Sequence, residues 1–244
     1  MQEEIFPLTV ERIIPETPRV KTLRLRPEQG NLPFRFLPGQ HMGVSPRSTD
    51  SNRPKNPSDW RHFSLSSSAE NKAYAEITVL SQGTASSSLH RLSPGDGVEV
   101  TRPTGRFTLE DPTDHGPVFF GAGIGAAPIR SMVRTCLDRG LGEAITVLLA
   151  FSSVEEAIFL DAFKAWAAET PRMDLRVHLS GPAPSGKRAP ARAGLHDPAL
   201  LRECIARPGE RTCYLCLPAG LRDDVHTALV TVGVSTEQIR AERW

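Results

Sequence analysis

Residues 121–128 have the sequence Gly-Ala-Gly-Ile-Gly-Ala-Ala-Pro, and this stretch decides the fold of the 244-residue chain. It follows the apolar run Val118-Phe119-Phe120 and precedes apolar residues at helical spacing. Glycines between a strand and a helix let the backbone approach a pyrophosphate, and the helix N-terminus attracts its negative charge. A tight strand-to-helix turn without a ligand has the same pattern, so the stretch alone leaves both interpretations open.

The pattern around this stretch alternates between strand and helix. Five apolar runs predict strands at residues 118–120, 145–150, 174–179, 213–216 and 239–243. Helical spacing marks segments that follow Pro128, Phe159 and Leu221. The alternation predicts a doubly wound α/β domain with a parallel sheet over residues 115–244.

Residues 1–114 have a different rhythm. Six short β-prone runs occupy residues 8–14, 22–26, 40–44, 61–65, 75–79 and 98–101. Turn signals such as Pro38-Gly39 and Pro94-Gly95-Asp96-Gly97 separate them, and no long helical period intervenes. This half is therefore predicted to be a six-stranded antiparallel Greek-key β-barrel, with a surface loop at residues 46–59.

Composition excludes several classes of function. The net charge is +1 with interspersed signs, so no basic stripe points to nucleic acid. The first ten residues lack a signal-peptide pattern, and no stretch reaches the about 18 apolar residues that span a bilayer. We therefore expect a cytoplasmic protein that binds small molecules and not a membrane.

The four cysteines show no disulfide framework and no iron–sulfur spacing. Cys213 and Cys216 form a C-x-x-C pair, but they lie in an apolar run that predicts a strand. Residues three apart on a strand point to opposite faces, which argues against zinc or a dithiol at this pair. No metal site is expected.

Residues 123–128 resemble the G-x-G-x-x-P nicotinamide-nucleotide motif of the ferredoxin-NADP reductase superfamily. Further signatures of that family follow in its order along nearly the whole chain. They are Arg61-His62-Phe63-Ser64 for R-x-Y/F-S, Gly83-Thr84-Ala85-Ser86 for G-x-x-S, Pro103-Thr104-Gly105-Arg106-Phe107 for P-x-G-x-F, Cys216-Leu217-Pro218 for C-G-P, and Glu242-Arg243-Trp244 for E-x-aromatic.

The resemblance implies that the N-terminal domain holds FAD. Arg61 would pair with a flavin phosphate, Phe63 would stack on the isoalloxazine, and Ser64 would face its reactive edge. Gly83 and Ser86 would bind the flavin phosphates, and His62 lies within the same motif as Arg61. Without the family, Arg61 would be read as a surface charge and Phe63 as a ring of the core.

The resemblance also implies the residues around the nicotinamide nucleotide. The cofactor-binding set comprises Gly123, Gly125, Pro128 and Ser152. Cys216 would border the nicotinamide, Glu242 would lie near the flavin edge, and Trp244 would cover the second flavin face. The predicted catalytic residues are thus Ser64, Cys216, Glu242 and Trp244, whereas residues 103–107 are expected to be structural.

Two positions depart from the family pattern. Leu217 replaces the glycine of C-G-P, so its side chain either crowds the nicotinamide or points into the core. Ser152 stands where many relatives carry an arginine that contacts the adenosine end of the nicotinamide nucleotide. The absence of that arginine weakens the case for NADPH without excluding it. Lys187, Arg188 and Arg192 either replace that charge or form a solvated loop.

The resemblance implies an FAD-dependent oxidoreductase that takes a hydride from NADH or NADPH. Electrons would pass to a separate acceptor, such as a ferredoxin, flavodoxin, cytochrome P450 or oxygenase component. One alternative is a flavin-binding partner subunit or sensor in which Leu217 blocks the nicotinamide. Another is a biosynthetic flavoenzyme that acts on a small organic substrate.

Overall fold

The computed structural model describes residues 4–47, 60–81, 88–109, 116–142, 144–181 and 194–242. The chain divides into two compact units, Met1–Thr108 and Leu109–Trp244. The domain boundary expected after residue 114 falls within residues 110–115, which lie outside the described ranges. Most of the expected surface loop, residues 48–59, also lies outside them.

The N-terminal unit is a six-stranded antiparallel sheet. Its strands are β1 (Ile5–Thr17), β2 (Val20–Arg26), β3 (His41–Pro46), β4 (Arg61–Ser64), β5 (Ala75–Leu80) and β6 (Gly97–Thr101). They are arranged in the order β4-β3-β6-β1-β2-β5. Each strand overlaps one of the six runs predicted from the sequence.

The two outer strands of this sheet meet, so the sheet curls into the expected barrel. Leu65, directly after β4, forms an antiparallel bridge with Ile77 of β5, and the Ser66 amide donates to the Glu76 carbonyl at 2.8 Å. Alternate residues such as Leu23 and Leu25 of β2 are fully buried in the barrel core. The apolar side chains at alternate positions of β2 therefore line the inside of the barrel.

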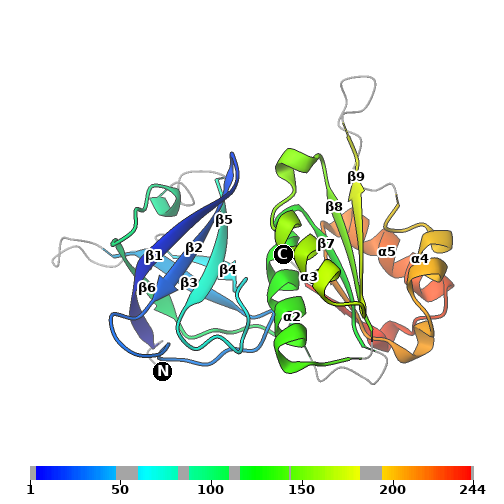
Figure 1. Cartoon of the computed structure of the whole chain (residues 1–244), viewed down its shortest axis with the longest axis horizontal. Helices are drawn as coiled ribbons and strands as arrows, with labels where there is room; N and C mark the ends of the chain where they lie inside the picture. The colour runs from blue at the N-terminus through cyan, green and yellow to red at the C-terminus, as the bar shows by residue number, and fades with distance from the viewer. Residues whose placement is uncertain are drawn as a thin grey trace. The chain divides into compact units, whose positions relative to one another are not determined.

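The C-terminal unit is a five-stranded parallel sheet. Its strands are β7 (Val118–Ala122), β8 (Ile145–Phe151), β9 (Met173–Leu179), β10 (Cys213–Cys216) and β11 (Ile239–Ala241). Helices α2 (Ala126–Arg139) and α3 (Leu160–Glu169) lie on one side of the sheet, and α4 (Pro198–Cys204) and α5 (Ala219–Thr231) lie on the other (Figure 1). This confirms the doubly wound α/β prediction.

Helix α4 is an addition to the predicted elements. Asp197 is its N-cap, because the carboxylate accepts a hydrogen bond from the Ala199 amide at 2.9 Å, and Pro198 occupies the first helical position. The dipeptide Asp197-Pro198 is therefore the local signal for this helix. None of the helices in the described ranges is long and apolar enough to cross a membrane.

Strand order places a switch point in the C-terminal sheet. The order is β11-β10-β7-β8-β9, so the chain builds outward from β7 to β9 and then returns to add β10 on the opposite side of β7. In open α/β sheets, ligands bind outside the carboxyl ends of the strands at such a point. A ligand site is therefore expected at the carboxyl ends of β7 and β10.

A buried arginine holds the opposite, amino-terminal edge of this sheet. Arg211 is 3% exposed, and its guanidinium donates to the carbonyls of Gly116, Pro117 and Ala144, each at 3.1 Å. Gly116 has φ +77°, and a Cβ there would lie 1.9 Å from the Ala144 carbonyl oxygen. Arg211 thus links the starts of β7 and β8 to the segment before β10.

Replacement of Arg211 by alanine is expected to destabilise the C-terminal unit. Three buried carbonyls lose a charged donor, which should lower the free energy of unfolding by about 3 kcal/mol. Urea unfolding followed by far-UV circular dichroism measures this change. The control is Arg176→Ala, which removes an exposed ion pair with Asp174 and should cost less than about 1 kcal/mol. Equal losses in the two variants would contradict the role given to Arg211.

Candidate functional site

The glycine-rich turn at the carboxyl end of β7 combines tight packing with an open face. A Cβ at Gly121 would lie 3.1 Å from Leu149 Cδ2 and 3.2 Å from the Ala126 Cα, so this glycine lets helix α2 pack on the sheet. Gly123 has φ +53°, and no described atom lies within 4 Å of a Cβ built there. The backbone at Gly123 is thus open to a ligand, which suits the close approach of a pyrophosphate.

Gly125 joins the two halves of the sheet at the switch point. A Cβ there would lie 2.2 Å from the Cys216 carbonyl oxygen and 3.2 Å from its Sγ. Pro128 is buried in the first turn of α2, where its missing N–H has no intrahelical partner to lose. The structure thus brings Gly125 and Cys216 together, and the assignment of Gly123, Gly125, Pro128 and Cys216 to one nucleotide site stays a prediction.

Glu242 comes from the neighbouring strand at the same edge. It follows β11, which pairs in parallel with β10, and its amide donates to the Leu215 carbonyl at 2.9 Å. Burial raises the pKa of the Glu242 carboxyl above its ordinary value. The carboxyl ends of β7, β10 and β11 therefore gather Gly125, Cys216 and Glu242 along one edge of the sheet.

The C-x-x-C pair behaves as its strand position predicts. Cys213 lies in the core cluster that faces α4 and α5, whereas Cys216 Sγ approaches Gly125 on the other side of the sheet. All four cysteines are free and buried, and burial raises the pKa of the Cys213 thiol to about 12. Cys213 and Cys216 thus face opposite sides of the strand.

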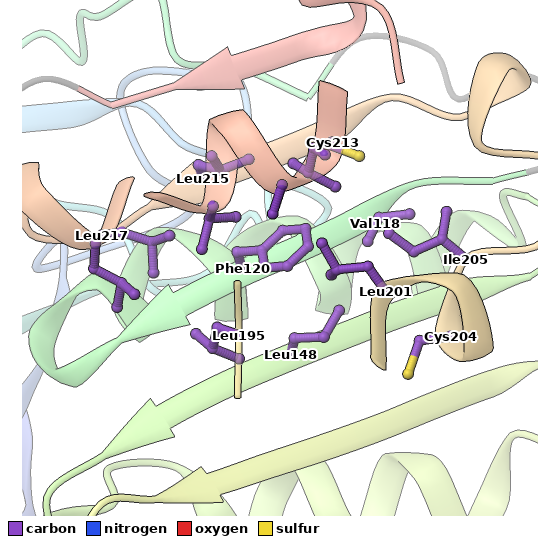
Figure 2. Close-up of a cluster of buried hydrophobic side chains, with 14 of the residues drawn as sticks. Val118, Phe120, Leu148, Leu195, Leu201, Cys204, Ile205, Cys213, Leu215 and Leu217 are labelled. Carbon is purple, nitrogen blue, oxygen red and sulfur yellow. The ribbon is translucent and has the colours of Figure 1, made fainter. Parts of the chain in front are cut away.

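Leu217 points into the core. It is 2% exposed and belongs to the same buried cluster as Leu215 and Leu221, where Figure 2 shows it with Phe120 and Leu201. The sequence left open whether the Leu217 side chain crowds the nicotinamide or points into the core, and the structure shows the second orientation. The leucine consequently fills space beneath α5 that a glycine would leave empty.

Ser152 lies at the end of the neighbouring strand, β8, and is exposed. Strand β8 pairs with β7 in parallel, with Ala122 opposite Ala150, so the loops that follow both strands emerge at the same edge. Ser152 is thereby separated from Cys216 by the width of β7.

The flavin motif of the N-terminal unit lies on β4, an outer strand of the barrel. Arg61 and His62 are exposed, while Phe63 and Ser64 are half-buried. Phe63 packs on the barrel core with part of its ring and leaves the rest accessible, which suits stacking on a planar ring. The Arg61 guanidinium also donates to the Trp60 carbonyl at 2.6 Å. An exposed cation, an accessible ring and a hydroxyl on one short strand fit a flavin and its phosphate.

The structure shows a pair of histidines beside this motif that the sequence does not indicate. The rings of His41 and His62 make an edge-on contact at 5.5 Å, and His41 Nε2 lies 3.4 Å from Thr104 Oγ1. Gly105 has φ +118°, and a Cβ there would lie 3.0 Å from His41 Nδ1. The segment of residues 103–107, for which only a structural role was expected, thus supports a ring that touches the flavin motif. Nothing in the sequence pairs residues 41, 62 and 105.

Three predicted site residues lie outside the described residues: Gly83, Ser86 and Trp244. The basic residues Lys187, Arg188 and Arg192 lie outside them as well. Their roles stay predictions.

Comparison with solved structures identifies the class of fold. The FAD/NAD-binding domain of nitric oxide dioxygenase from Vibrio cholerae O1 biovar El Tor aligns over 98% of both chains with a TM-score of 0.78 and 24% identity. Phthalate dioxygenase reductase aligns over 98% of this chain and 67% of its own, with a TM-score of 0.77 and 21% identity. The chain therefore has the same fold as these two proteins.

Sequence comparison places the chain more narrowly. The family profile described as "Oxidoreductase FAD-binding domain" matches residues 7–109. "Ferredoxin--NADP reductase B" of Sorangium cellulosum is 30% identical over 194 residues, which are 75% of this chain and 78% of that protein. The flavohemoprotein of Halalkalibacterium halodurans is 28% identical over 98% of this chain, which spans 59% of it. The chain belongs to the ferredoxin-NADP reductase superfamily, as its motifs predicted.

The two glycines of the turn should respond differently to alanine. Gly123→Ala has space but must hold a left-handed backbone, which costs about 1–2 kcal/mol. Gly125→Ala places its methyl group against a backbone carbonyl and should cost about 3 kcal/mol or more. Urea unfolding of both variants measures the difference. A Gly123→Ala variant less stable than Gly125→Ala would contradict the packing described here.

The pH dependence of stability should report on the histidine pair. Burial, and then the charge of His62, lowers the pKa of His41 below its ordinary value. The unfolded chain therefore takes up this proton first, and stability is lost as the pH falls from about 6.5 towards the folded-state pKa. Thermal unfolding of His41→Gln should show a smaller decrease in Tm between pH 7.5 and 5.5 than the wild type. His62→Gln removes the charge of His62 but leaves His41 buried, so its decrease in Tm should be intermediate. Identical decreases in all three proteins would show that His41 is not the group responsible.

Proposed function

We propose that this protein is an FAD-dependent NAD(P)H oxidoreductase that passes electrons to a separate acceptor. The observation that carries the proposal is the open glycine turn packed against Cys216 at the switch point of the C-terminal sheet. The same chain presents an arginine, an aromatic ring and a hydroxyl on an outer strand of a barrel that matches an FAD-binding profile. One unit binds a flavin and the other a nicotinamide nucleotide.

The N-terminal unit holds FAD through β4. The Arg61 guanidinium pairs with a flavin phosphate, the accessible part of Phe63 stacks on the ring system, and the Ser64 hydroxyl faces the reactive edge. Gly83 and Ser86 complete the phosphate site. The FAD supplies hydride and single-electron chemistry when bound, and the protein supplies position and electrostatics.

The C-terminal unit holds the nicotinamide nucleotide along the carboxyl edge of its sheet. The backbone at Gly123 and the start of α2 face the pyrophosphate, Cys216 borders the nicotinamide, and Ser152 lies at the adenosine end. Glu242 supplies a carboxyl that holds its proton to a higher pH than an exposed glutamate, because burial raises its pKa. Trp244 keeps the role that the sequence predicts for it.

The acceptor is a separate redox protein. Relatives named as the ferredoxin reductase component of 3-ketosteroid-9-alpha-monooxygenase, from Rhodococcus rhodochrous, and as a cytochrome P450 reductase, from Amycolatopsis, support an acceptor of the ferredoxin, cytochrome P450 or oxygenase kind. The chain spans 64% and 71% of these two proteins, respectively. A cytoplasmic location stays a prediction from the sequence.

The burial of Leu217 argues against the blocked sensor. That alternative required a leucine side chain over the nicotinamide site, whereas Leu217 lies in the core beneath α5. An anaerobic titration of the flavin-loaded protein with NADH and then NADPH tests the proposed function through the absorbance of oxidised flavin. We expect at least one nucleotide to bleach the flavin rapidly. A bound flavin that stays oxidised with both would overturn the proposal.

Arg61→Ala should weaken FAD binding. A charge-assisted hydrogen bond contributes about 1.5–3 kcal/mol, so the Kd for FAD should rise at least roughly tenfold. Fluorescence quenching of added FAD by the apoprotein measures the Kd. The matched control is Arg12→Ala, an exposed arginine on β1 of the same sheet, which should leave the Kd unchanged. An unchanged Kd in Arg61→Ala would remove this residue from the phosphate site.

A further inference from the structure

The outer surface of the barrel carries two histidines whose rings are in contact. His41 of β3 alternates with Met42 and Val44, which lie in the barrel core, so its side chain points away from that core. Strand β4 pairs with β3 in antiparallel register, with Gly43 opposite His62. His41 is therefore the diagonal neighbour of His62, a spacing that long side chains can bridge. The two ring centroids are 5.5 Å apart, and the ring planes meet at 76°.

Thr104 brings a hydroxyl to the same place from the other side of β3. The His41 amide donates to the Thr104 carbonyl at 2.9 Å, and the Thr104 amide donates to the His41 carbonyl at 2.8 Å, so the two residues are directly opposed. Thr104 Oγ1 lies 3.4 Å from His41 Nε2. His41 Nδ1 instead packs on Gly105, where a Cβ would lie 3.0 Å away. Nε2 is thus the ring nitrogen that lies beside the hydroxyl.

The spacing of the two rings suits a metal ion held between them. Zn²⁺ binds imidazole nitrogen at about 2.0–2.1 Å in tetrahedral geometry, which puts the centroids of two bound rings about 5 Å apart. The observed 5.5 Å requires only a small rotation of the exposed His62 ring. Thr104 Oγ1 and water can take the remaining positions. Imidazole suits Zn²⁺ and Cu²⁺, whereas Mg²⁺ and Ca²⁺ prefer oxygen ligands.

A histidine must be neutral to bind a metal ion, and His41 meets this requirement. Burial, and then the charge of His62, lowers the pKa of His41 below its ordinary value. His41 is therefore mainly unprotonated at neutral pH and has a lone pair on one ring nitrogen. Protons compete with a metal ion for these nitrogens, so binding should weaken as the pH falls.

We propose that His41 and His62 bind a divalent transition-metal ion of the Zn²⁺ or Cu²⁺ kind, with the Thr104 hydroxyl beside it. This site stands on the geometry of the barrel and does not depend on the proposed function. The two histidines are 21 positions apart in the sequence, so no short motif indicates the site.

The position of the site also gives the ion a regulatory role, and this second step rests on the proposed function. His62 stands between Arg61 and Phe63 in the proposed flavin motif, and His41 is paired with Ser64 across the two strands. A bound ion adds two positive charges beside that motif. They stabilise the negative charge that a flavin gains on reduction, so the ion raises the midpoint potential of the flavin.

Binding of the metal alone gives the first test, with the untagged, flavin-loaded full chain. Calorimetry should show one site for Zn²⁺ that Mg²⁺ does not occupy. His41→Gln and His62→Gln should each raise the Kd for Zn²⁺ at least roughly tenfold, because each removes a ligand. The matched control is His226→Gln on α5 of the other unit, which should leave this Kd unchanged.

Electron paramagnetic resonance with Cu²⁺ identifies the ligands directly. The bound ion should show hyperfine coupling to two imidazole nitrogens, and either glutamine variant should reduce this to one. Thr104→His adds a third imidazole next to His41 and should lower the Kd for Zn²⁺ at least roughly tenfold. Far-UV circular dichroism of each variant checks that the fold is retained.

A redox titration tests the regulatory step. The midpoint potential of the bound flavin should rise when Zn²⁺ is added to the wild type and stay constant in His62→Gln. By linkage, Zn²⁺ should then bind the reduced protein more tightly than the oxidised protein.

Each contrary outcome addresses a separate claim. A Kd for Zn²⁺ that is the same in the wild type, His41→Gln and His62→Gln, or coupling to fewer than two nitrogens in the wild type, would overturn the metal site. Zn²⁺ binding that leaves the midpoint potential unchanged would overturn the regulatory step alone. A flavin that neither nucleotide reduces would overturn the proposed function and would leave the metal site standing.

Discussion

The contact between Gly125 and the Cys216 carbonyl is the constraint on which the C-terminal unit depends. A Cβ at Gly125 would lie 2.2 Å from that oxygen, so the start of α2 and the end of β10 meet with backbone against backbone. The contact spans the point where the strand order reverses. It therefore brings Gly125 and Cys216, which are 91 positions apart in the sequence, to one edge of the sheet, next to an open backbone at Gly123.

Other contacts of the C-terminal unit, away from the Gly125–Cys216 contact, stabilise the sheet that carries this edge. Arg211 ties the opposite edge of the sheet through three carbonyls, and the buried cluster between the sheet and α4 and α5 fills the interior. Leu217 takes part in core packing and also leaves the backbone edge open. It directly follows Cys216, yet its side chain lies in the cluster, so the position serves packing and leaves the adjoining edge to the backbone.

In the barrel, the site residues that the structure describes lie on one short outer strand, β4. Along β4, Arg61 is exposed, whereas Phe63 is half-buried and packs part of its ring on the barrel core. His41 and Gly105 come from elsewhere in the chain and support His62 from the side. The flavin motif is thus local in sequence, but its support is not.

The sequence by itself determined the strands of both units, the change of rhythm between them and the residues of the local motifs. Those features depend on periods of two and 3.6 and on short-range turn chemistry, which neighbouring residues specify. It also carried a signal for α4 in Asp197-Pro198, although the surrounding composition obscured it. Only the tertiary structure decided which way Leu217 points, which ring His41 touches and which carbonyls Arg211 binds. Each of these depends on contacts between residues distant along the chain, and no local period or propensity encodes such contacts.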